Sequence, residues 1–128
     1  MSQPIIYNKF KSGNYDQRKF DISLIIIHFT ETRTFDDALN LLTSLDRKVS
    51  SHYLIDKSGD IFNLVDLDKR AWHAGESMWG NYDDINSRSI GIEIVNSGEV
   101  IIEDYTAKQI NSLSVLLNSL LKDYNIEN

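Results

Sequence analysis

The sequence predicts one α/β domain in which helices flank a mixed central β-sheet. Three observations lead to this prediction: a continuous apolar run at residues 24–27, two β-rich runs joined by a short Lys-Ser-Gly connection, and two segments with apolar residues at helical spacing. The 128 residues are 41% hydrophobic and 25% charged, which suffices for one modest core. We therefore expect a single domain over residues 1–128.

The first predicted strand covers residues 22–29 and carries four apolar residues in a row. A run without alternation is typical of a central strand that is buried on both faces. The strand places His28 at its C-terminal end. A histidine in this position is either a satisfied core residue or a metal ligand, and both interpretations stay open at this point.

Two helices are predicted from their start signals and their periodicity. Thr34 has the spacing of a capping box with the residue three positions on, and helical spacing continues over residues 35–45. Thr106 and Gln109 form a second capping box before an amphipathic helix that ends near residue 125. Both helices are expected to pack on the sheet.

A β-hairpin is predicted between these helices. Its two strands, residues 49–56 and 60–65, are joined by a polar connection that contains Gly59. We expect the strands to be antiparallel neighbours. His52 lies on the first of them. We interpret it as a structural residue or as a residue that contacts the site residues without contacting the ligand.

The strand predicted at residues 89–95 alternates, with isoleucines on one face and Gly91 and Glu93 on the other. Glu93 is either an ordinary solvent-facing residue or a general base that acts on a bound water. Glycine inside a strand often marks the close approach of a ligand or another backbone. Gly91 therefore favours an open slot over this face, with Glu93 as the candidate catalytic residue.

A long polar stretch, residues 66–89, contains Trp72, His73, Trp79 and Tyr82. A loop of this length in a compact domain is usually functional or disordered, and its aromatic residues favour a function. Trp72 and His73 are the candidate substrate-binding residues, since amphipathic rings suit sugar and peptide ligands. The alternative is that Trp72 covers the core and His73 is solvated.

Composition excludes several classes of site and partner. The absence of cysteine leaves imidazole and oxygen as metal ligands. A net charge of −6 argues against nucleic acid as a partner. No apolar run approaches the roughly 20 residues of a membrane span, and the N-terminal residues do not have the pattern of a secretory signal. We expect no membrane association and a cytoplasmic protein.

The three histidines could in principle form a zinc site with Glu93 as the base, because catalytic zinc takes three protein ligands and a water. The spacing of His28, His52 and His73 does not require such a site. No local metal motif such as HExxH is present. From the residues alone, the sequence indicates an α/β domain with a possible hydrolase site.

Four segments, taken in order, are more specific than any single residue. Their sequence resembles the N-acetylmuramoyl-L-alanine amidase family, the type-2 amidases that include AmpD-like enzymes and peptidoglycan recognition proteins. The resemblance covers roughly residues 22–124. It rests on LIIIHFT (24–30), VSSHYLIDKSGDIFNLV (49–65), KRAWHAGES (69–77) and SIGIEIVN (89–96).

The resemblance implies a fold, a cofactor and a reaction. The fold is a mixed sheet flanked by helices, the cofactor is one zinc ion, and the reaction is hydrolysis of the amide between N-acetylmuramic acid and L-alanine in peptidoglycan or muropeptides. His28 matches the first zinc ligand and Glu93 the catalytic glutamate, while Trp72 and His73 match the border of the substrate groove. The alternative function is a non-catalytic muropeptide-binding module.

The sequence departs from the family pattern after its last predicted helix. The family carries a second histidine ligand, an aspartate or cysteine ligand and a basic catalytic residue there, in a segment similar to GHxDIxPxRKxDPG. This segment is absent from the 128 residues. We therefore expect a domain truncated at its C-terminus, with the other zinc ligands beyond Asn128 and with the 128-residue chain inactive by itself.

Overall fold

The computed structural model describes residues 3–75, 80–99 and 104–126. The elements in these ranges are short strands and three helices. In chain order they are β1 (Ile6–Tyr7), β2 (Tyr15–Gln17), β3 (Leu24–Phe29), α1 (Phe35–Thr43), β4 (Tyr53–Ile55), β5 (Ile61–Asn63), β6 (Lys69–Ala71), α2 (Ile85–Arg88), β7 (Ser89–Ile94) and α3 (Ala107–Asp123).

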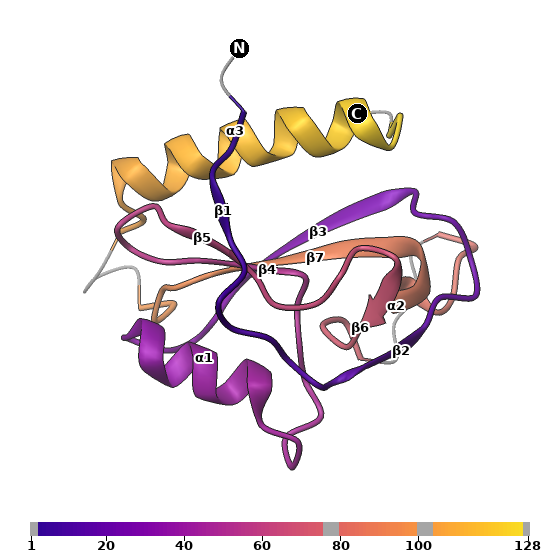
Figure 1. Ribbon diagram of the computed structural model, residues 1–128, viewed down its shortest axis with the longest axis horizontal. Helices are drawn as coiled ribbons and strands as arrows, with labels where there is room; N and C mark the ends of the chain where they lie inside the picture. The colour runs from indigo at the N-terminus through magenta and orange to yellow at the C-terminus, as the bar shows by residue number, and fades with distance from the viewer. Residues whose placement is uncertain (1–2, 76–79, 100–103, 127–128) are drawn as a thin grey trace.

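The central sheet is mixed, as predicted. Its strand order is β1-β5-β4-β7-β3, in which β4 and β5 are antiparallel and the other neighbours are parallel. The predicted hairpin is therefore confirmed. A second sheet of two antiparallel strands joins β2 to β6. Figure 1 shows this small sheet and α2 together beside one end of the central sheet.

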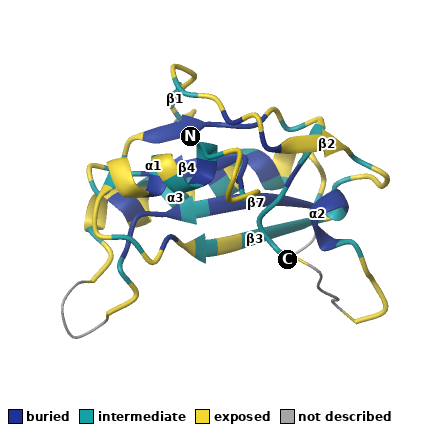
Figure 2. Cartoon of the chain, turned by 90° about the horizontal axis from the view of Figure 1, so that it is seen from below, coloured by how far each residue is buried: buried dark blue, intermediate teal, exposed yellow. Residues whose placement is uncertain are grey.

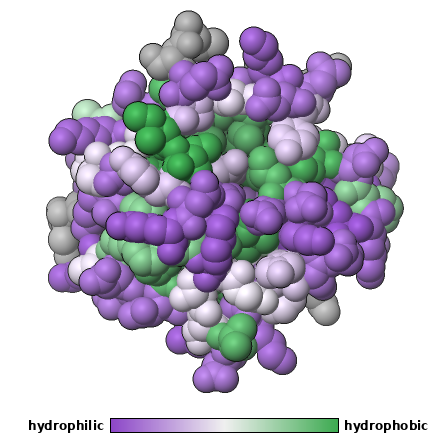
Figure 3. All heavy atoms as spheres, in the orientation of Figure 1, coloured by the Kyte–Doolittle hydropathy of each residue, from purple (hydrophilic) through white to green (hydrophobic). Residues whose placement is uncertain are grey.

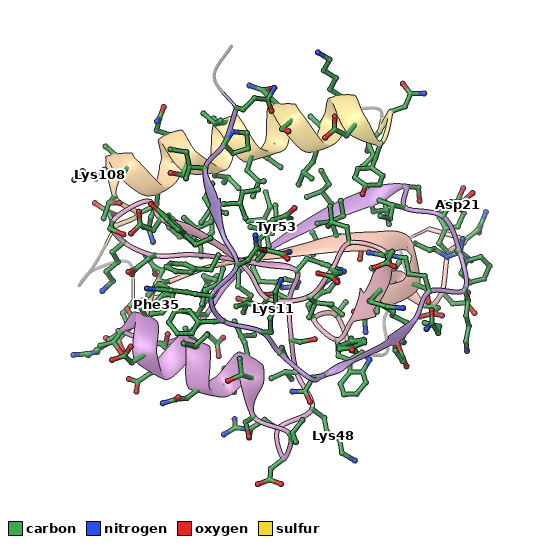
Figure 4. All side chains as sticks on the ribbon, in the orientation of Figure 1. Lys11, Asp21, Phe35, Lys48, Tyr53 and Lys108 are labelled. Carbon is green, nitrogen blue, oxygen red and sulfur yellow. The ribbon has the colours of Figure 1, made fainter. Side chains whose placement is uncertain are left out.

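The central sheet lies between two helices, with α3 on one face and α1 on the other (Figure 1). On the α3 face, Tyr53 packs in a cluster with Ile92, Leu116 and other buried residues. On the α1 face, Leu54 packs with Ala38, Leu42 and other residues. Figure 4 shows Tyr53 between the sheet and α3. The molecule thus has three layers with an apolar cluster at each interface.

The start of each long helix follows from its capping residues. Thr34 accepts a hydrogen bond from the backbone N–H of Asp37 at 3.1 Å. Thr106 and Gln109 form the complete reciprocal box. Both predicted starts are confirmed. The first helix ends at Thr43, two residues before the predicted end, and Leu45 beyond it is 69% exposed.

The prediction of a central strand at residues 22–29 is wrong in one respect. Among the described strands, β3 is the last in the sheet order and pairs with β7. Ile27 and Phe29 are 45% and 44% exposed, and Figure 2 shows β3 at the margin of the sheet. A short apolar run does not distinguish an edge strand from a central one, because it carries no information on how many neighbours the strand has.

The stretch predicted as one long loop, residues 66–89, is partly regular. It contains β6 and α2, and α2 contacts both β6 and β7. Tyr82 lies on the surface and is 51% exposed, whereas Trp79 lies outside the described residues. The loop is therefore shorter than predicted, and its two regular pieces hold Trp72 and His73 between them.

The surface seen in Figure 3 is mostly hydrophilic, with apolar patches between the polar side chains. This agrees with a chain that carries 19 acidic and 13 basic residues. Within the part of the chain that the structure describes, no helix has the length and apolar character needed to cross a membrane.

Candidate active site

The parallel pairing of β3 with β7 brings two predicted site residues together. His28 on β3 is in register with Glu93 on β7, and Glu93 is in register with Leu54 on β4. Residues in register on neighbouring strands point to the same face of a sheet. Leu54 packs in the cluster against α1, so His28 and Glu93 also point to the α1 face.

The Glu93 carboxyl group combines an unpartnered oxygen atom with a raised pKa. Its Oε2 atom is buried and has no hydrogen-bond partner among the described residues. Burial raises the pKa of the Glu93 carboxyl to about 8, and the negative charge of Glu31 adds to the rise. A carboxyl group with a pKa near the working pH can both give and take a proton, as general acid–base chemistry requires.

The elevated pKa of Glu93 gives a prediction for stability. Between about pH 4.5, where an ordinary glutamate titrates, and about pH 8, the folded protein keeps a proton that the unfolded chain releases. This contribution to stability is complete below the unfolded pKa and is lost as the pH rises through the folded pKa.

Comparison with the Glu93→Gln variant isolates this effect, because glutamine does not ionise. Relative to the variant, the free energy of unfolding of the wild type should fall by at most about 1.4 kcal/mol per pH unit across the window. Denaturant titrations of both proteins without metal, at several pH values from about 4 to 8, measure it. Parallel curves for the two proteins would contradict the elevated pKa.

His28 contacts a second histidine. Its Nε2 atom lies 3.0 Å from Nδ1 of His73, and the two rings meet edge to face with centroids 5.2 Å apart. Burial lowers the pKa of His28, so the imidazole is neutral near pH 7. A neutral imidazole is the form that binds a metal ion or accepts a proton.

His73 fills the space over Gly91. An added Cβ at Gly91 would lie 2.4 Å from Cδ2 of His73, so a side chain at this position and the present ring exclude each other. The predicted slot over this face is therefore not open at Gly91, because a side chain of the protein itself occupies it. Glycine is required here for the close approach of His73.

The His73 ring is held by neighbours on both sides. Its Nε2 atom lies 3.0 Å from Oγ of Ser89, and its backbone N–H donates to Oδ1 of Asn86. Burial lowers the pKa of His73 to about 3, and the charges of His28 and His52 contribute after it. His73 is thus neutral, and both of its ring nitrogens face polar atoms of this protein.

His52 is a structural residue, in agreement with the sequence interpretation. It is fully buried, its Nδ1 accepts a hydrogen bond from the backbone N–H of Gly91 at 3.0 Å, and its Nε2 lies 2.8 Å from the carbonyl oxygen of Lys69. Because Nδ1 accepts, Nε2 carries the proton and donates to that carbonyl. Burial lowers the pKa of His52 to about 4. His52 therefore connects β7 to β6.

Arg18 supports the same region and was not predicted from the sequence. Its guanidinium donates hydrogen bonds to the carbonyl oxygens of Leu67, Asn86 and Ser87. It also lies 3.0 Å from Nε2 of His52, a contact between two donors that adds no hydrogen bond. Burial lowers the pKa of Arg18. The residue stands outside any periodic segment, so the sequence carries no signal for this role.

Trp72 is half-buried, and its indole N–H group has no hydrogen-bond acceptor among the described residues. Its backbone N–H and carbonyl group both bond to Ser50, which fixes the chain at this point. Its Nε1 atom is buried and finds no hydrogen-bond partner within the described residues. A buried N–H group without a partner is uncommon, and a ligand that supplies an acceptor would satisfy it.

The imidazole nitrogen of His28 is a donor type that zinc accepts. The described residues, however, supply fewer than the three protein ligands that a catalytic zinc ion normally takes. Two imidazole nitrogens on one tetrahedral zinc lie about 3.3 Å apart, given zinc–nitrogen distances of about 2.0–2.1 Å. The 3.0 Å between His28 and His73 is a hydrogen-bond separation. In residues 3–75, 80–99 and 104–126, no group of three His, Asp or Glu side chains is placed to hold a metal ion.

The described residues also form a second hollow. It has a volume of about 900 Å³, is found beside the C-terminal end of α3, and its lining includes Arg18, Phe20, Asp68 and Tyr124. His28, Trp72 and Glu93 are not among the residues that line it. Because none of the predicted site residues lines this hollow, we do not assign it to the candidate site.

Comparison with known proteins agrees with the sequence resemblance. A family described as N-acetylmuramoyl-L-alanine amidase matches residues 17–128. The N-acetylmuramoyl-L-alanine amidase AmiD of Escherichia coli is 34% identical over 119 residues, which cover 83% of this chain and 42% of AmiD. The chain thus spans less than half the length of that relative.

Two further matches add to this. One covers a larger share of the relative, and the other is a solved complex with a substrate. The 1,6-anhydro-N-acetylmuramyl-L-alanine amidase AmpD of Haemophilus influenzae is 32% identical, over 91% of this chain and 72% of AmpD. The solved complex of E. coli AmiD with the substrate anhydro-N-acetylmuramic acid-L-Ala-D-γ-Glu-L-Lys matches with a TM-score of 0.74 and 33% identity, over 83% of this chain and 45% of that chain. The chain belongs to the N-acetylmuramoyl-L-alanine amidase family.

Proposed function

We propose that this domain hydrolyses the amide bond between N-acetylmuramic acid and L-alanine in muropeptides, with Glu93 as the proton-transfer residue. The observation that carries the proposal is the buried Oε2 atom of Glu93, which lacks a partner in the described part of the chain and is in register with His28. The AmiD complex supports muropeptide as the ligand class, since that relative was solved with such a substrate.

Each residue of the proposed site has a separate task. His28 contributes one ligand to a zinc ion, which when bound supplies a Lewis acid and lowers the pKa of a water molecule. Glu93 takes a proton from the attacking water and passes it to the leaving amine of L-alanine. Trp72 borders the groove and offers its indole N–H to a substrate acceptor, and His73 lies at the same border.

An assay of the bond that is cut tests the proposal. The protein expressed from its whole gene would be incubated with zinc and anhydro-N-acetylmuramyl tripeptide, and the products separated by liquid chromatography with mass detection. We expect free anhydro-N-acetylmuramic acid and a peptide that begins with L-alanine. Binding without cleavage would support the non-catalytic binding module instead. Parallel reactions with purified sacculi determine whether intact cell wall is also a substrate.

Zinc retention is a second prediction. Catalytic zinc normally takes three protein ligands, and the family resemblance assigns only His28 to residues 1–128. We therefore propose that these 128 residues by themselves hold zinc weakly and do not turn over muropeptides. Metal analysis after dialysis should find well below one zinc per chain. Stoichiometric zinc together with turnover would contradict this and would favour a site that includes His73.

Trp72 gives a prediction that separates binding from folding. Trp72→Ala is expected to weaken muropeptide binding more than it weakens the fold, because the ring is half-buried and its N–H group has no partner among the described residues. Calorimetric titration and thermal unfolding measure the two effects. A stability loss of about 3–5 kcal/mol, typical of core tryptophan, would show that Trp72 serves the core.

A further inference from the structure

A chain of hydrogen bonds with a fixed direction ends at His28. It begins at Ser89, whose Oγ lies 2.7 Å from the carbonyl oxygen of Ile85 and 3.0 Å from Nε2 of His73. A carbonyl oxygen only accepts, so the hydroxyl proton of Ser89 points to Ile85. The lone pairs of Ser89 Oγ then face His73, and His73 Nε2 must carry the proton that it donates.

The direction continues through the His73 ring. A neutral imidazole carries one N–H, so Nδ1 of His73 has a lone pair. This atom lies 3.0 Å from Nε2 of His28, which must therefore be the donor. The proton of His28 is thus on Nε2, and its Nδ1 atom is the nitrogen left with a free lone pair.

The local fold holds His73 in the orientation that this series of hydrogen bonds requires. Asn86 and Ser89 are three residues apart across the end of α2, so they lie on the same side of the helical turn. Asn86 Oδ1 accepts from the backbone N–H groups of His73 and Ala74, while Ser89 accepts from the ring. Gly91, two residues further along β7, leaves room for the ring on the same face.

We propose that His73 is a positioning residue, which fixes the tautomer and the ring orientation of His28 through the chain Ile85–Ser89–His73–His28. Its effect is to keep Nδ1 of His28 available to an electrophile, for which a divalent zinc ion is the chemical fit. Outer partners of this kind fix which nitrogen of a ligand histidine is protonated. The consequence for zinc rests on the proposed function, whereas the tautomer of His28 in the metal-free chain does not.

The tautomers can be observed directly by NMR. Two-bond ¹H–¹⁵N correlation spectra of the metal-free, ¹⁵N-labelled chain near pH 7.5 distinguish a protonated ring nitrogen from an unprotonated one. We expect the Nε2–H pattern for His28 and His73. Adding zinc should shift or broaden the Nδ1 signal of His28 and spare its Nε2–H. An Nδ1–H pattern for His28, or an average of both tautomers, would overturn the proposal.

Two substitutions at His73 form a matched pair. His73→Asn places an amide oxygen near the position of Nδ1 and should keep His28 in the single Nε2–H form. His73→Leu fills similar space without an acceptor and should give His28 a mixture of tautomers. If His28 keeps one tautomer in both variants, another group positions it and the proposal fails. Thermal unfolding of both variants confirms that they are folded.

If His73→Leu does not fold, Ser89→Ala tests the same proposal at the first hydrogen bond of the series, the one that Ser89 makes with Ile85 and His73. Loss of the hydroxyl should remove the single Nε2–H form of His73 and, with it, that of His28. An unchanged His28 in this variant would also contradict the proposal. The NMR result can be told apart from the result of the amidase assay. Fixed tautomers without any muropeptide cleavage would refute the proposed function and leave the positioning role of His73 intact.

Discussion

Replacing Glu93 with glutamine is expected to lower the rate of muropeptide hydrolysis by about 10²-fold or more. Glutamine keeps the shape of the side chain but does not accept a proton, so the water and the leaving amine lose their proton-transfer partner. Turnover by the zinc-supplemented product of the whole gene, at saturating muropeptide, measures the loss. The zinc content should not change, because Glu93 is not proposed as a ligand.

Glu31→Gln is the matched control for this variant. The negative charge of Glu31 contributes to the elevated pKa of Glu93, after the larger effect of burial. Removing that charge should shift the pH dependence of the rate to lower pH and leave the maximum rate much closer to wild type. Turnover of the Glu93→Gln variant near the wild-type level would remove Glu93 from the mechanism.

Adding one methyl group at Gly91 is expected to have the second large effect. The new Cβ would lie 2.4 Å from Cδ2 and 2.5 Å from Cγ of the His73 ring, so the ring has to move. Overpacking of this kind costs about 1–3 kcal/mol of stability. The movement also breaks the contacts of His73 with Ser89 and His28, and we expect a loss of activity together with the loss of stability.

A double-mutant cycle shows whether the His73 ring is the cause. A His73→Ala background removes the three ring atoms that lie nearest to the added Cβ. Alanine is preferred over glycine within a strand by about 0.5–1 kcal/mol. Gly91→Ala should therefore be neutral or stabilising there, although it destabilises the wild type. Equal destabilisation in both backgrounds, measured by urea unfolding, would mean that the backbone of β7 and not the ring requires glycine.

The local elements could be predicted because their signals are contained in a few adjacent residues. Thr34 and Thr106 mark the two helix starts by their spacing to the residue that each one caps. The alternation in β7 placed Glu93 opposite the isoleucines. The sheet order could not be predicted in the same way, because the apolar run of β3 is compatible with one neighbour or two.

The candidate site was predicted in part. His28 and Glu93 were identified as candidates from their strands, but the register that brings them together is a property of the folded sheet. Gly91 was interpreted as the mark of an open slot for a ligand, and this was wrong, because the ring of His73 fills that space. A glycine shows that space is needed and does not show what fills it.

The supporting polar residues could not be predicted, because each resembles an ordinary solvated residue in the sequence. Asn86 and Ser89 are common types at turns and helix ends, yet both are buried and bond to His73. Arg18 lies in a segment without periodicity and donates to three carbonyl oxygens in other segments. Such roles depend on which atoms meet in space, and sequence spacing does not determine that.

We propose that muropeptide binds over the face of the sheet on which Glu93 and His28 lie. Titration of the ¹⁵N-labelled chain with anhydro-N-acetylmuramyl tripeptide, followed by amide and indole NMR signals, tests it most directly and does not depend on zinc. We expect the largest shifts at the Trp72 indole and at the amides of Gly91 and Glu93. Absence of shifts, or shifts centred on the hollow that contains Tyr124, would contradict the assignment of the site.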